Sequence, residues 1–377
     1  MKKIITGVKP TGASMHLGNL LGAVLPFDRI AKGNDAAIFI ADLHALTSVH
    51  DGEKLRKQSH ELALTYLAVH GPDTDIAIFR QSDIALIPKL NWVLASVTPY
   101  SLMNRAHSVK DKEIRNKIDG LMRAYDAKRS HNNYIINETN ASSPELFDLV
   151  RHLEDTIERI RLEISSNANE LGDLNMATFT YPILMAADIL AYDTDVVPVG
   201  KDQIQHLEMA RDIARAFNKT YGSEVFKEPV AHVEKAVETL PGIDGRKMSK
   251  SYDNFLGVFD DEKTLKKKIG QIVTGSEGLD DPKPLDNNVY ALAKVFATSE
   301  RLASMKEKFE KGTGYGYGHA KMELLEILLD YLKPYRERYA ALKDDPAFVE
   351  EVLRKGAARM NARIEAKMSQ VSKLVGL

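Results

Sequence analysis

Residues 4–22 read Ile-Ile-Thr-Gly-Val-Lys-Pro-Thr-Gly-Ala-Ser-Met-His-Leu-Gly-Asn-Leu-Leu-Gly and place a strand, a loop and a helix start next to one another. The β-branched pair Ile4-Ile5 is typical of a buried strand. Pro10 and Gly12 lie in the loop and allow the backbone to turn sharply. His16-Leu17-Gly18-Asn19 opens an apolar helix, whose free N–H groups and positive dipole end attract phosphate. This order is the first unit of a nucleotide-binding α/β sheet.

The same loop has a second interpretation, a tight turn between strand and helix with one surface histidine. It contains neither G-x-G-x-x-G nor G-x-x-x-x-G-K-[ST], so the dinucleotide fingerprint and the P-loop do not fit. His16 and Asn19 are three residues apart and therefore share one face of the first helical turn. The stretch taken alone leaves both interpretations open.

The composition of the chain bounds its class. The 377 residues suffice for two or three domains, and 44% hydrophobic with 28% charged residues is typical of a soluble globular protein. No apolar run is long enough to span a bilayer, and the N-terminus has no signal-peptide pattern, so we expect no membrane association. The absence of cysteine excludes disulfides and thiol catalysis and is compatible with a cytoplasmic location. A net charge of −2 means that nucleic acid would need a local basic surface.

Strands and helices alternate through the first half of the chain. Apolar runs at 35–42, 75–79 and 195–199 are typical of buried strands, and 53–70 has helical periodicity. We expect Asp83 to cap a helix whose only tryptophan, Trp92, lies in the core. The alternation predicts an α/β fold with a Rossmann-type, doubly wound parallel sheet.

Polar residues follow two of these strands. Asp42 and His44 stand where ligands bind in open α/β sheets. The alternative is that Asp42 caps the next turn and His44 is a hydrogen-bonded core histidine. In residues 180–190, Tyr181, Met185 and Asp188 line one face of an apolar helix. A buried Asp188 must find a partner, either a ligand donor or a neighbouring arginine or backbone N–H.

The segment between these elements has a different character. Residues 104–129 are the densest basic stretch of the N-terminal half and form either a solvated face or a phosphate-contacting surface. Residues 143–164 carry a narrow apolar seam, as in a two-helix hairpin or a short dimer contact. We therefore interpret about 111–175 as a helical insertion within the sheet domain.

The last third of the chain has a loop followed by helices. Residues 240–254 place Lys247 and Lys250 in a loop rich in glycine and proline, suited to closing over phosphates or forming an exposed basic turn. Helices are predicted at 262–273, 287–297, 299–311, 319–341 and 346–375, with no further strand. The last carries one basic face, made by Lys355, Arg359, Arg363 and Lys367.

Two motifs resemble a known family. His16-Leu17-Gly18-Asn19 looks like a variant of the His-Ile-Gly-His signature, and Lys247-Met248-Ser249-Lys250-Ser251 matches Lys-Met-Ser-Lys-Ser in full. In this order they resemble class I aminoacyl-tRNA synthetases. The stretch Tyr181–Asp188, followed by Pro198–Gln203, is similar to the tryptophanyl branch of that family rather than the tyrosyl branch.

The resemblance implies an organisation and a reaction. Residues 1–257 would be a Rossmann catalytic domain with the insertion at about 111–175. Residues 258–377 would be an all-helical anticodon-binding domain whose last helix packs back on the catalytic domain. The expected enzyme is a cytoplasmic homodimer that activates L-tryptophan with ATP and Mg²⁺, releases pyrophosphate and charges tRNA(Trp). No metal-binding side chains are expected.

The resemblance also implies roles for individual residues. The catalytic residues would be His16, Lys110, Lys247 and Lys250. ATP would be bound by Lys9, Pro10, Thr11, His16, Gly18, Asn19, Gly200, Lys201, Asp202, Val237, Lys247, Met248, Ser249, Lys250 and Ser251. Tryptophan would be bound by Ile5, Gly7, His44, Tyr181, Met185, Asp188, Val197, Val199 and Gln203, with Asp188 accepting the indole N–H.

The sequence departs from the family pattern in two places. Lys9 stands where many bacterial members have glutamine and could reach a phosphate. The segment before the second signature is shorter, so the residue packing on adenine is either Val237 or Leu240. The rival functions are a tyrosyl-tRNA synthetase or related nucleotidyl transferase, and an RNA-binding paralogue that does not charge tRNA.

Overall fold

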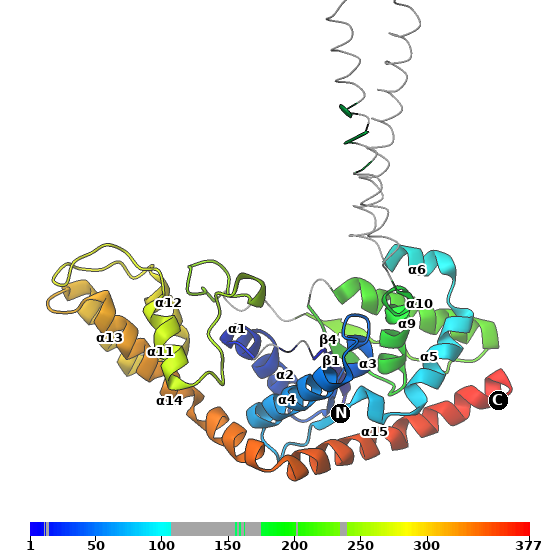
Figure 1. Ribbon diagram of the computed structural model, residues 1–377. Helices are drawn as coiled ribbons and strands as arrows, with labels where there is room; N and C mark the ends of the chain where they lie inside the picture. Colours follow the sequence, from blue (N-terminus) through cyan, green and yellow to red (C-terminus); the bar gives the residue numbers. More distant parts are fainter. Residues whose placement is uncertain are drawn as a thin grey trace, which may run out of the picture.

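A five-stranded parallel sheet forms the centre of the molecule (Figure 1). The computed structural model describes residues 1–10, 12, 15–106, 155–156, 158–159, 162, 175–200, 203–233 and 240–377. The strand order is β3-β2-β1-β4-β5. Their bounds are β1 Lys3–Val8, β2 Asp35–Ile40, β3 Ala77–Arg80, β4 Val196–Pro198 and β5 Val230–His232. The predicted parallel α/β fold is confirmed, although the three-residue strand β5 was not predicted.

Neighbouring residues of each strand face opposite sides of the sheet and enter separate cores. Ile5 and Phe39 pack with α5, α9 and α10, whereas Ile4 and Ile38 pack with α2 and α4. Both faces of the sheet are therefore covered, as expected for continuous apolar strands. The order reverses between β1 and β4, which places a crevice at the carboxyl ends of these two strands.

Helices make up most of the remaining described chain. Around the sheet they are α1 (Leu17–Asn19), the π-helical η1 (Leu20–Val24), α2 (Leu25–Ala31), α3 (Asp42–Ala45), α4 (Gly52–His70), the 3₁₀ turn η2 (Gln81–Asp83), α5 (Leu86–Val97), α6 (Tyr100–Ala106), α9 (Met176–Leu190) and α10 (Ile204–Tyr221). The 3₁₀ turn η4 (Lys250–Tyr252) begins within the second signature. It is followed by five helices: α11 (Glu262–Gly270), α12 (Asn288–Phe296), α13 (Ser299–Lys311), α14 (Tyr317–Asp344) and α15 (Pro346–Val375).

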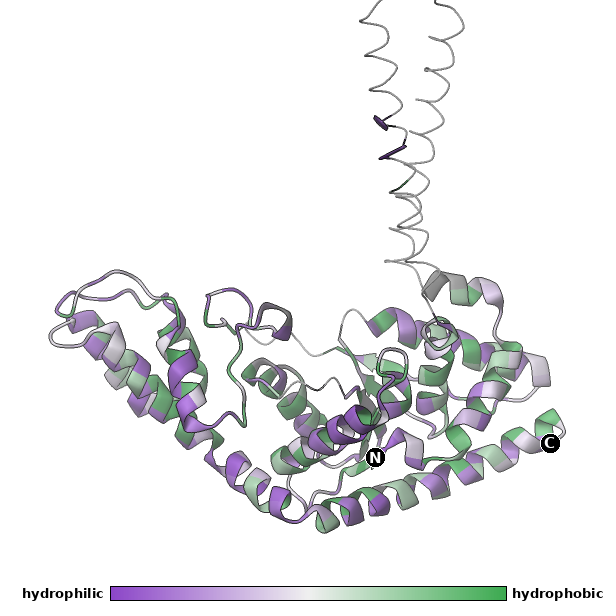
Figure 2. Ribbon diagram, in the orientation of Figure 1, coloured by the Kyte–Doolittle hydropathy of each residue, from purple (hydrophilic) through white to green (hydrophobic). Residues whose placement is uncertain are grey.

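The C-terminal helices share a core with the start of the chain. Leu17 and Leu20 lie in the same buried cluster as Leu256, Leu265 and residues of α12, α13 and α14. The long helix α14 leads to α15, which runs beneath the sheet in Figure 1 and contacts β3. Hydrophobic and hydrophilic residues alternate along α15 in Figure 2, as expected for a helix with one face packed on the protein. The division at residue 257 stays a prediction.

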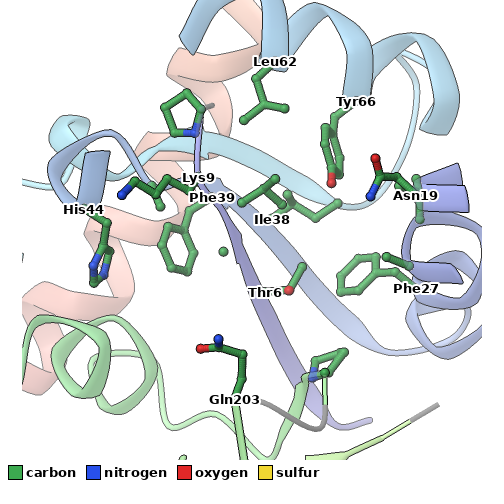
Figure 3. A pocket seen from close by; sticks show the side chains of 18 of the residues that line it. Thr6, Lys9, Asn19, Phe27, Ile38, Phe39, His44, Leu62, Tyr66 and Gln203 are labelled. Carbon is green, nitrogen blue, oxygen red and sulfur yellow. The ribbon is translucent and has the colours of Figure 1, made fainter. Parts of the chain in front are cut away.

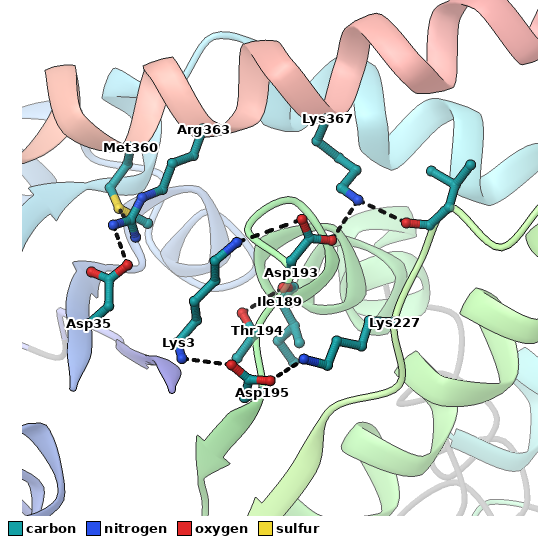
Figure 4. A network of polar contacts seen from close by, with 11 residues as sticks. Lys3, Asp35, Ile189, Asp193, Thr194, Asp195, Lys227, Met360, Arg363 and Lys367 are labelled. Atoms are coloured by element: carbon teal, nitrogen blue, oxygen red, sulfur yellow. Dashed lines mark hydrogen bonds and ion pairs between the residues drawn. The ribbon is translucent and has the colours of Figure 1, made fainter. Parts of the chain in front are cut away.

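Three of the four residues of the predicted basic face of α15 bind acidic partners on the sheet domain, whereas Lys355 pairs with Glu351 of the same helix. Arg359 and Arg363 both pair with Asp35, which begins β2. Lys367 Nζ lies 2.5 Å from Asp193 Oδ1 and 2.8 Å from the carbonyl oxygen of Val225 (Figure 4). Gly356 lies against β3, where an added Cβ would meet the Ile78 carbonyl carbon at 2.8 Å. These contacts hold α15 along the edge of the sheet.

Two expectations for the helix after β3 are wrong. Trp92 is 77% exposed, because α5 buries Ile87, Leu90 and Leu94 on one face and Trp92 lies off that face. Asp83 does not cap α5: it belongs to η2, and the helix begins only at Leu86. The predicted insertion at 111–175 lies outside the described residues, apart from 155–156, 158–159, 162 and 175.

Candidate functional site

A cavity of about 1670 Å³ lies at the carboxyl ends of β1 and β4. Drug-sized ligands occupy pockets of roughly 300–1000 Å³, so this space can hold more than one small molecule. In Figure 3, His44 and Lys9 lie toward one end of the cavity, and Asn19 and Phe27 lie toward the other. Gly7 lines the wall where an added Cβ would overlap the Phe39 ring, so only glycine fits there.

His16 caps the first helix. Its Nδ1 accepts a hydrogen bond of 3.2 Å from the Asn19 amide, and the Asn19 side chain lies 3.5 Å from the His16 amide. Burial, together with the nearby positive charge of Lys250, lowers the pKa of His16 to about 4. The imidazole is therefore neutral near pH 7, and its unprotonated Nδ1 is available as the acceptor that the cap requires.

The first signature is joined by backbone hydrogen bonds to the segment that directly follows the second signature. The Leu17 amide donates to the Leu256 carbonyl at 3.0 Å, and the Val258 amide donates to the Met15 carbonyl at 2.8 Å. Met248 is buried in the cluster that contains Leu17, and its Cβ lies 4.0 Å from where a Cβ on Gly18 would be. Residues more than 200 positions apart in the chain thus form one wall.

Lys247 and Lys250 both line the cavity from this wall. Burial lowers the pKa of the Lys250 amine. Lys9 lines the cavity as well, and its Nζ donates to Thr47 Oγ1 at 2.9 Å and Ser48 Oγ at 3.2 Å. Burial lowers its pKa too. Three amines from two separated segments therefore face one space, which suits the binding of a highly charged anion.

The other end of the cavity has an aromatic and polar wall. Tyr181 and Met185 from α9 line it together with His44 and Gln203. The Tyr181 hydroxyl lies 2.5 Å from His206 Nε2, and His206 Nδ1 lies 3.0 Å from Gln203 Oε1. His206 was not selected from the sequence, although its position one turn into the helix after β4 was a usable signal. The floor here includes Ile5, Val197 and Val199.

Asp188 lies behind this wall and is not among the cavity-lining residues. The residue is 2% exposed, and both carboxylate oxygens accept hydrogen bonds from Gln81 Nε2, at 2.9 and 2.7 Å. His44 Nε2 lies 3.0 Å from Asp188 Oδ2. Burial raises the pKa of Asp188, and its hydrogen bonds with His44 and Gln81 counteract part of that rise. The acid therefore contacts the cavity through His44, and Gln81 was missed at the sequence level.

Asp42 and His44, which both follow β2, have different roles: Asp42 binds backbone amides and His44 lines the cavity. Asp42 Oδ1 accepts hydrogen bonds of 3.0 Å from the Leu43 and Ser82 amides, so this carboxylate stabilises the loops after β2 and β3. It is not the N-cap of α3, because Ala41 holds that position. His44 is both hydrogen-bonded to Asp188 and exposed to the cavity, so the two interpretations of this residue are compatible.

The remaining predicted site residues divide into three groups. Pro10, Asn19 and Gly200 line the cavity. His16, Gly18, Met248, Ser249 and Leu240 lie in the surrounding wall and are not among its lining residues. Thr11, Lys110, Lys201, Asp202, Val237 and the side chain of Ser251 lie outside the described part of the chain.

Comparison with known proteins places the chain in a family. The family of class I tRNA synthetases for W and Y matches residues 1–124 and 118–333. The chain is 37% identical to the tryptophan–tRNA ligase of Fusobacterium nucleatum subsp. nucleatum over 377 residues, covering 100% of this chain and 98% of the relative. It is also 37% identical to the tryptophan–tRNA ligase of Campylobacter jejuni, with both chains covered in full.

A solved structure agrees with these relatives. Tryptophanyl-tRNA synthetase from Campylobacter jejuni, crystallised with ADP and tryptophan, superposes with a TM-score of 0.78 at 36% identity, covering 100% of both chains. The fold and the paired signatures at one cavity define a class I aminoacyl-tRNA synthetase, and the chain belongs to that family. Within it, the chain is one of the tryptophan–tRNA ligases, ATP-dependent enzymes that join an amino acid to tRNA.

No helix within the described residues is both long and apolar enough to cross a membrane.

Proposed function

We propose that this cavity binds ATP at its Asn19–Lys250 end and L-tryptophan at its His44–Tyr181 end, and that the chain forms tryptophanyl-adenylate before charging tRNA(Trp). One observation supports the assignment: Met248 of the second signature packs in the same buried cluster as Leu17 of the first, and the segment that follows the second signature is hydrogen-bonded to Met15 and Leu17. The volume of about 1670 Å³ accommodates a nucleotide and an amino acid side by side.

The chemistry requires placement and charge compensation. The tryptophan carboxylate is already ionised, so it needs no general base. One of its oxygens forms a bond to the α-phosphorus of ATP as the bond to the β-phosphate oxygen breaks, and pyrophosphate leaves with that electron pair. Lys247 and Lys250 would offset the charge developing on the pyrophosphate. The neutral His16, as the cap of α1, would keep the N-terminus of that helix next to the phosphates. A terminal ribose hydroxyl of the tRNA then displaces AMP from the adenylate.

Mg²⁺ would arrive with the nucleotide. The described residues contain no group of three or more His, Asp or Glu side chains arranged to hold a metal ion. Mg²⁺ commonly keeps several waters and is held through substrate phosphates. The donor set therefore fits a cation carried by ATP, whose charge Lys9, Lys247 and Lys250 would supplement.

The amino-acid end offers contacts for each part of tryptophan. Tyr181 and Gln203, linked through His206, would hold the ammonium and carboxylate groups. Met185, Val197 and Val199 would enclose the ring. We propose that the indole N–H is recognised by the His44–Asp188 pair, with Asp188 as the acceptor if His44 moves aside. A site built for an N–H rejects substrates that lack one.

Other expectations stay predictions of this proposal. They are the assembly into a homodimer, the cytoplasmic location, the roles of the residues outside the described chain, and an anticodon-binding role for α11–α15. The contact of α15 with the sheet domain supports a coupling of the C-terminal helices to the catalytic part.

ATP–pyrophosphate exchange tests the proposal directly. We expect exchange that depends on tryptophan and is absent with tyrosine or with no amino acid, and charging of a tRNA(Trp) transcript. Lys250→Ala should lower the exchange rate about 100-fold, the range for loss of one preorganised charge-stabilising group. Lys266→Ala, on the exposed surface of α11, should not. Exchange with tyrosine, or none with either amino acid, would overturn the assignment.

A further inference from the structure

The loop that carries Lys247 and Lys250 is closed on itself by backbone hydrogen bonds. Pro241 and Lys247 form an antiparallel bridge. The Met248 amide donates to the Leu240 carbonyl at 2.9 Å, and the Gly242 amide donates to the Arg246 carbonyl at 2.7 Å. These bonds make residues 240–248 a small hairpin, and Met248 anchors it in the core. They do not fix the second half of the loop, where Lys250 lies.

A single buried side chain joins the two halves. Asn254 is 2% exposed, and its Oδ1 accepts the Ser249 amide at 2.8 Å. Its Nδ2 donates to the Lys247 carbonyl at 3.1 Å and to Asp244 Oδ1 at 2.7 Å. The Asn254 carbonyl also accepts the Ile243 amide at 2.9 Å. The Asn254 side chain therefore binds the backbone on both sides of Met248, and its remaining N–H binds Asp244.

The surrounding backbone is shaped for this contact. Asp253 has a φ of +49°, the left-handed region, which turns the chain back after η4 so that Asn254 faces the hairpin. Gly242 packs directly against it, and an added Cβ would lie 2.5 Å from both Asn254 Cγ and the Asn254 carbonyl oxygen. Any larger residue at 242 would push the amide away. Asp244 is itself held by the Arg246 side chain and amide, at 2.7 and 3.0 Å.

We propose that Asn254 is a positioning residue for the catalytic loop, which fixes the separation and direction of Lys247 and Lys250 by binding the backbone between them. The inference rests on the proposed function for its kinetic consequence. Asparagine is required because the contact needs one acceptor and two donors in the same planar group. Asn254 is not among the residues that line the cavity, so its effect passes through the two lysines.

The chain supplies a matched control. Asn218 at the end of α10 is also buried and binds a loop in the same manner: its Oδ1 accepts the Val225 and Phe226 amides at 3.1 and 3.0 Å, and its Nδ2 donates to the Phe226 carbonyl at 2.8 Å. Neither Asn218 nor residues 224–226 line the cavity. A purely structural role predicts similar effects for Asn254→Ala and Asn218→Ala.

The kinetic test measures ATP–pyrophosphate exchange by folded protein. We expect Asn254→Ala to lower kcat by about 10- to 100-fold, because small displacements of positioned groups have effects of this size. The KM for tryptophan should stay within twofold, and Asn218→Ala should leave kcat unchanged. Asn254→Asp should also lose activity, since it removes both donors and places a carboxylate beside Asp244. Asp244→Asn combined with Asn254→Asp restores a donor–acceptor pair and should recover at least threefold.

Limited trypsin digestion gives a readout independent of activity. Arg246, Lys247 and Lys250 are cleavage sites within the loop, and Asn254→Ala should accelerate cleavage there at least fivefold relative to wild type and Asn218→Ala. Unchanged kcat with unchanged loop cleavage would overturn the proposal. If wild type shows no tryptophan-dependent exchange, the proposed function fails, while the digestion still decides whether Asn254 holds the loop.

Discussion

Nε2 of His44 lies 3.0 Å from Oδ2 of Asp188, so a residue of the cavity wall shares a hydrogen bond with a buried acid 144 positions away in the chain. Gln81 completes the arrangement by donating to both oxygens of Asp188 while its own Oε1 accepts the Leu43 amide at 3.1 Å and the His44 amide at 3.3 Å. The acid, the amide and the imidazole thus form one unit beneath the proposed indole site.

Removal of the Asp188 carboxylate should weaken the use of tryptophan more than the use of ATP. Asp188→Ala leaves the Gln81 amide without its acceptors and His44, which lines the amino-acid end of the cavity, without its partner. We expect the KM for tryptophan to rise at least tenfold, about 1.4 kcal/mol, with the KM for ATP changed less than twofold. Saturation curves for each substrate in pyrophosphate exchange measure this. Equal tryptophan KM values for mutant and wild type would contradict the role of Asp188.

Replacement of the buried Gln81 should raise the KM for tryptophan nearly as much as replacement of Asp188. Gln81→Ala removes two donors from a carboxylate whose pKa burial already raises, and this favours the protonated acid. We expect a tryptophan KM about tenfold higher, since an unsatisfied buried polar group costs roughly 1–3 kcal/mol. Ser82→Ala is the control, because Ser82 binds Asp42 and not Asp188. A parallel rise in both KM values would show that Gln81 acts on the fold in general.

His16 should make stability depend on pH. Its pKa is lowered to about 4 from 6.5, mainly by burial, so between these values the unfolded chain binds a proton that the folded protein does not. Stability therefore falls as the pH decreases from 6.5 to 4. His16→Asn keeps a side-chain cap without this titration. Thermal unfolding at pH 7, 6 and 5 should show a smaller decrease of Tm for His16→Asn, and exposed His50→Asn should behave as wild type. Parallel Tm curves for His16→Asn and wild type would refute this.

The ion pairs beneath α15 should contribute to the stability of the whole chain. Asp35 is buried and binds both Arg359 and Arg363, whose side chains are partly exposed. We expect Asp35→Ala to lower the free energy of unfolding by about 2 kcal/mol, between the values for exposed and fully buried pairs. Glu351→Ala, which breaks only the exposed pair with Lys355, should change it by less than about 0.5 kcal/mol. Denaturant titration measures both, and equal losses would mean that α15 is held by apolar packing alone.

Several strands and helices could be predicted from the sequence because they depend on patterns of neighbouring residues. The apolar runs that became β1, β2 and β3 and the periodicity of α4 reflect burial on a fixed repeat of the backbone. The three-residue β5 has too few residues for any repeat, and it was missed. Trp92 was placed in the core from its residue type, although its own helix buries a different face.

The amino-acid sequence by itself determined four of the five strands, the two signature motifs and the helical C-terminal third, because glycine loops, apolar periodicity and contiguous motifs act over a few neighbouring residues. Only the tertiary structure decided which distant groups meet: Gln81 with Asp188, Asp35 with the arginines of α15, and Asn254 with the lysine loop. These polar side chains lose their hydrogen bonds to water when the chain folds. Each must then form hydrogen bonds with a group that the packed backbone places nearby, whatever its position in the sequence.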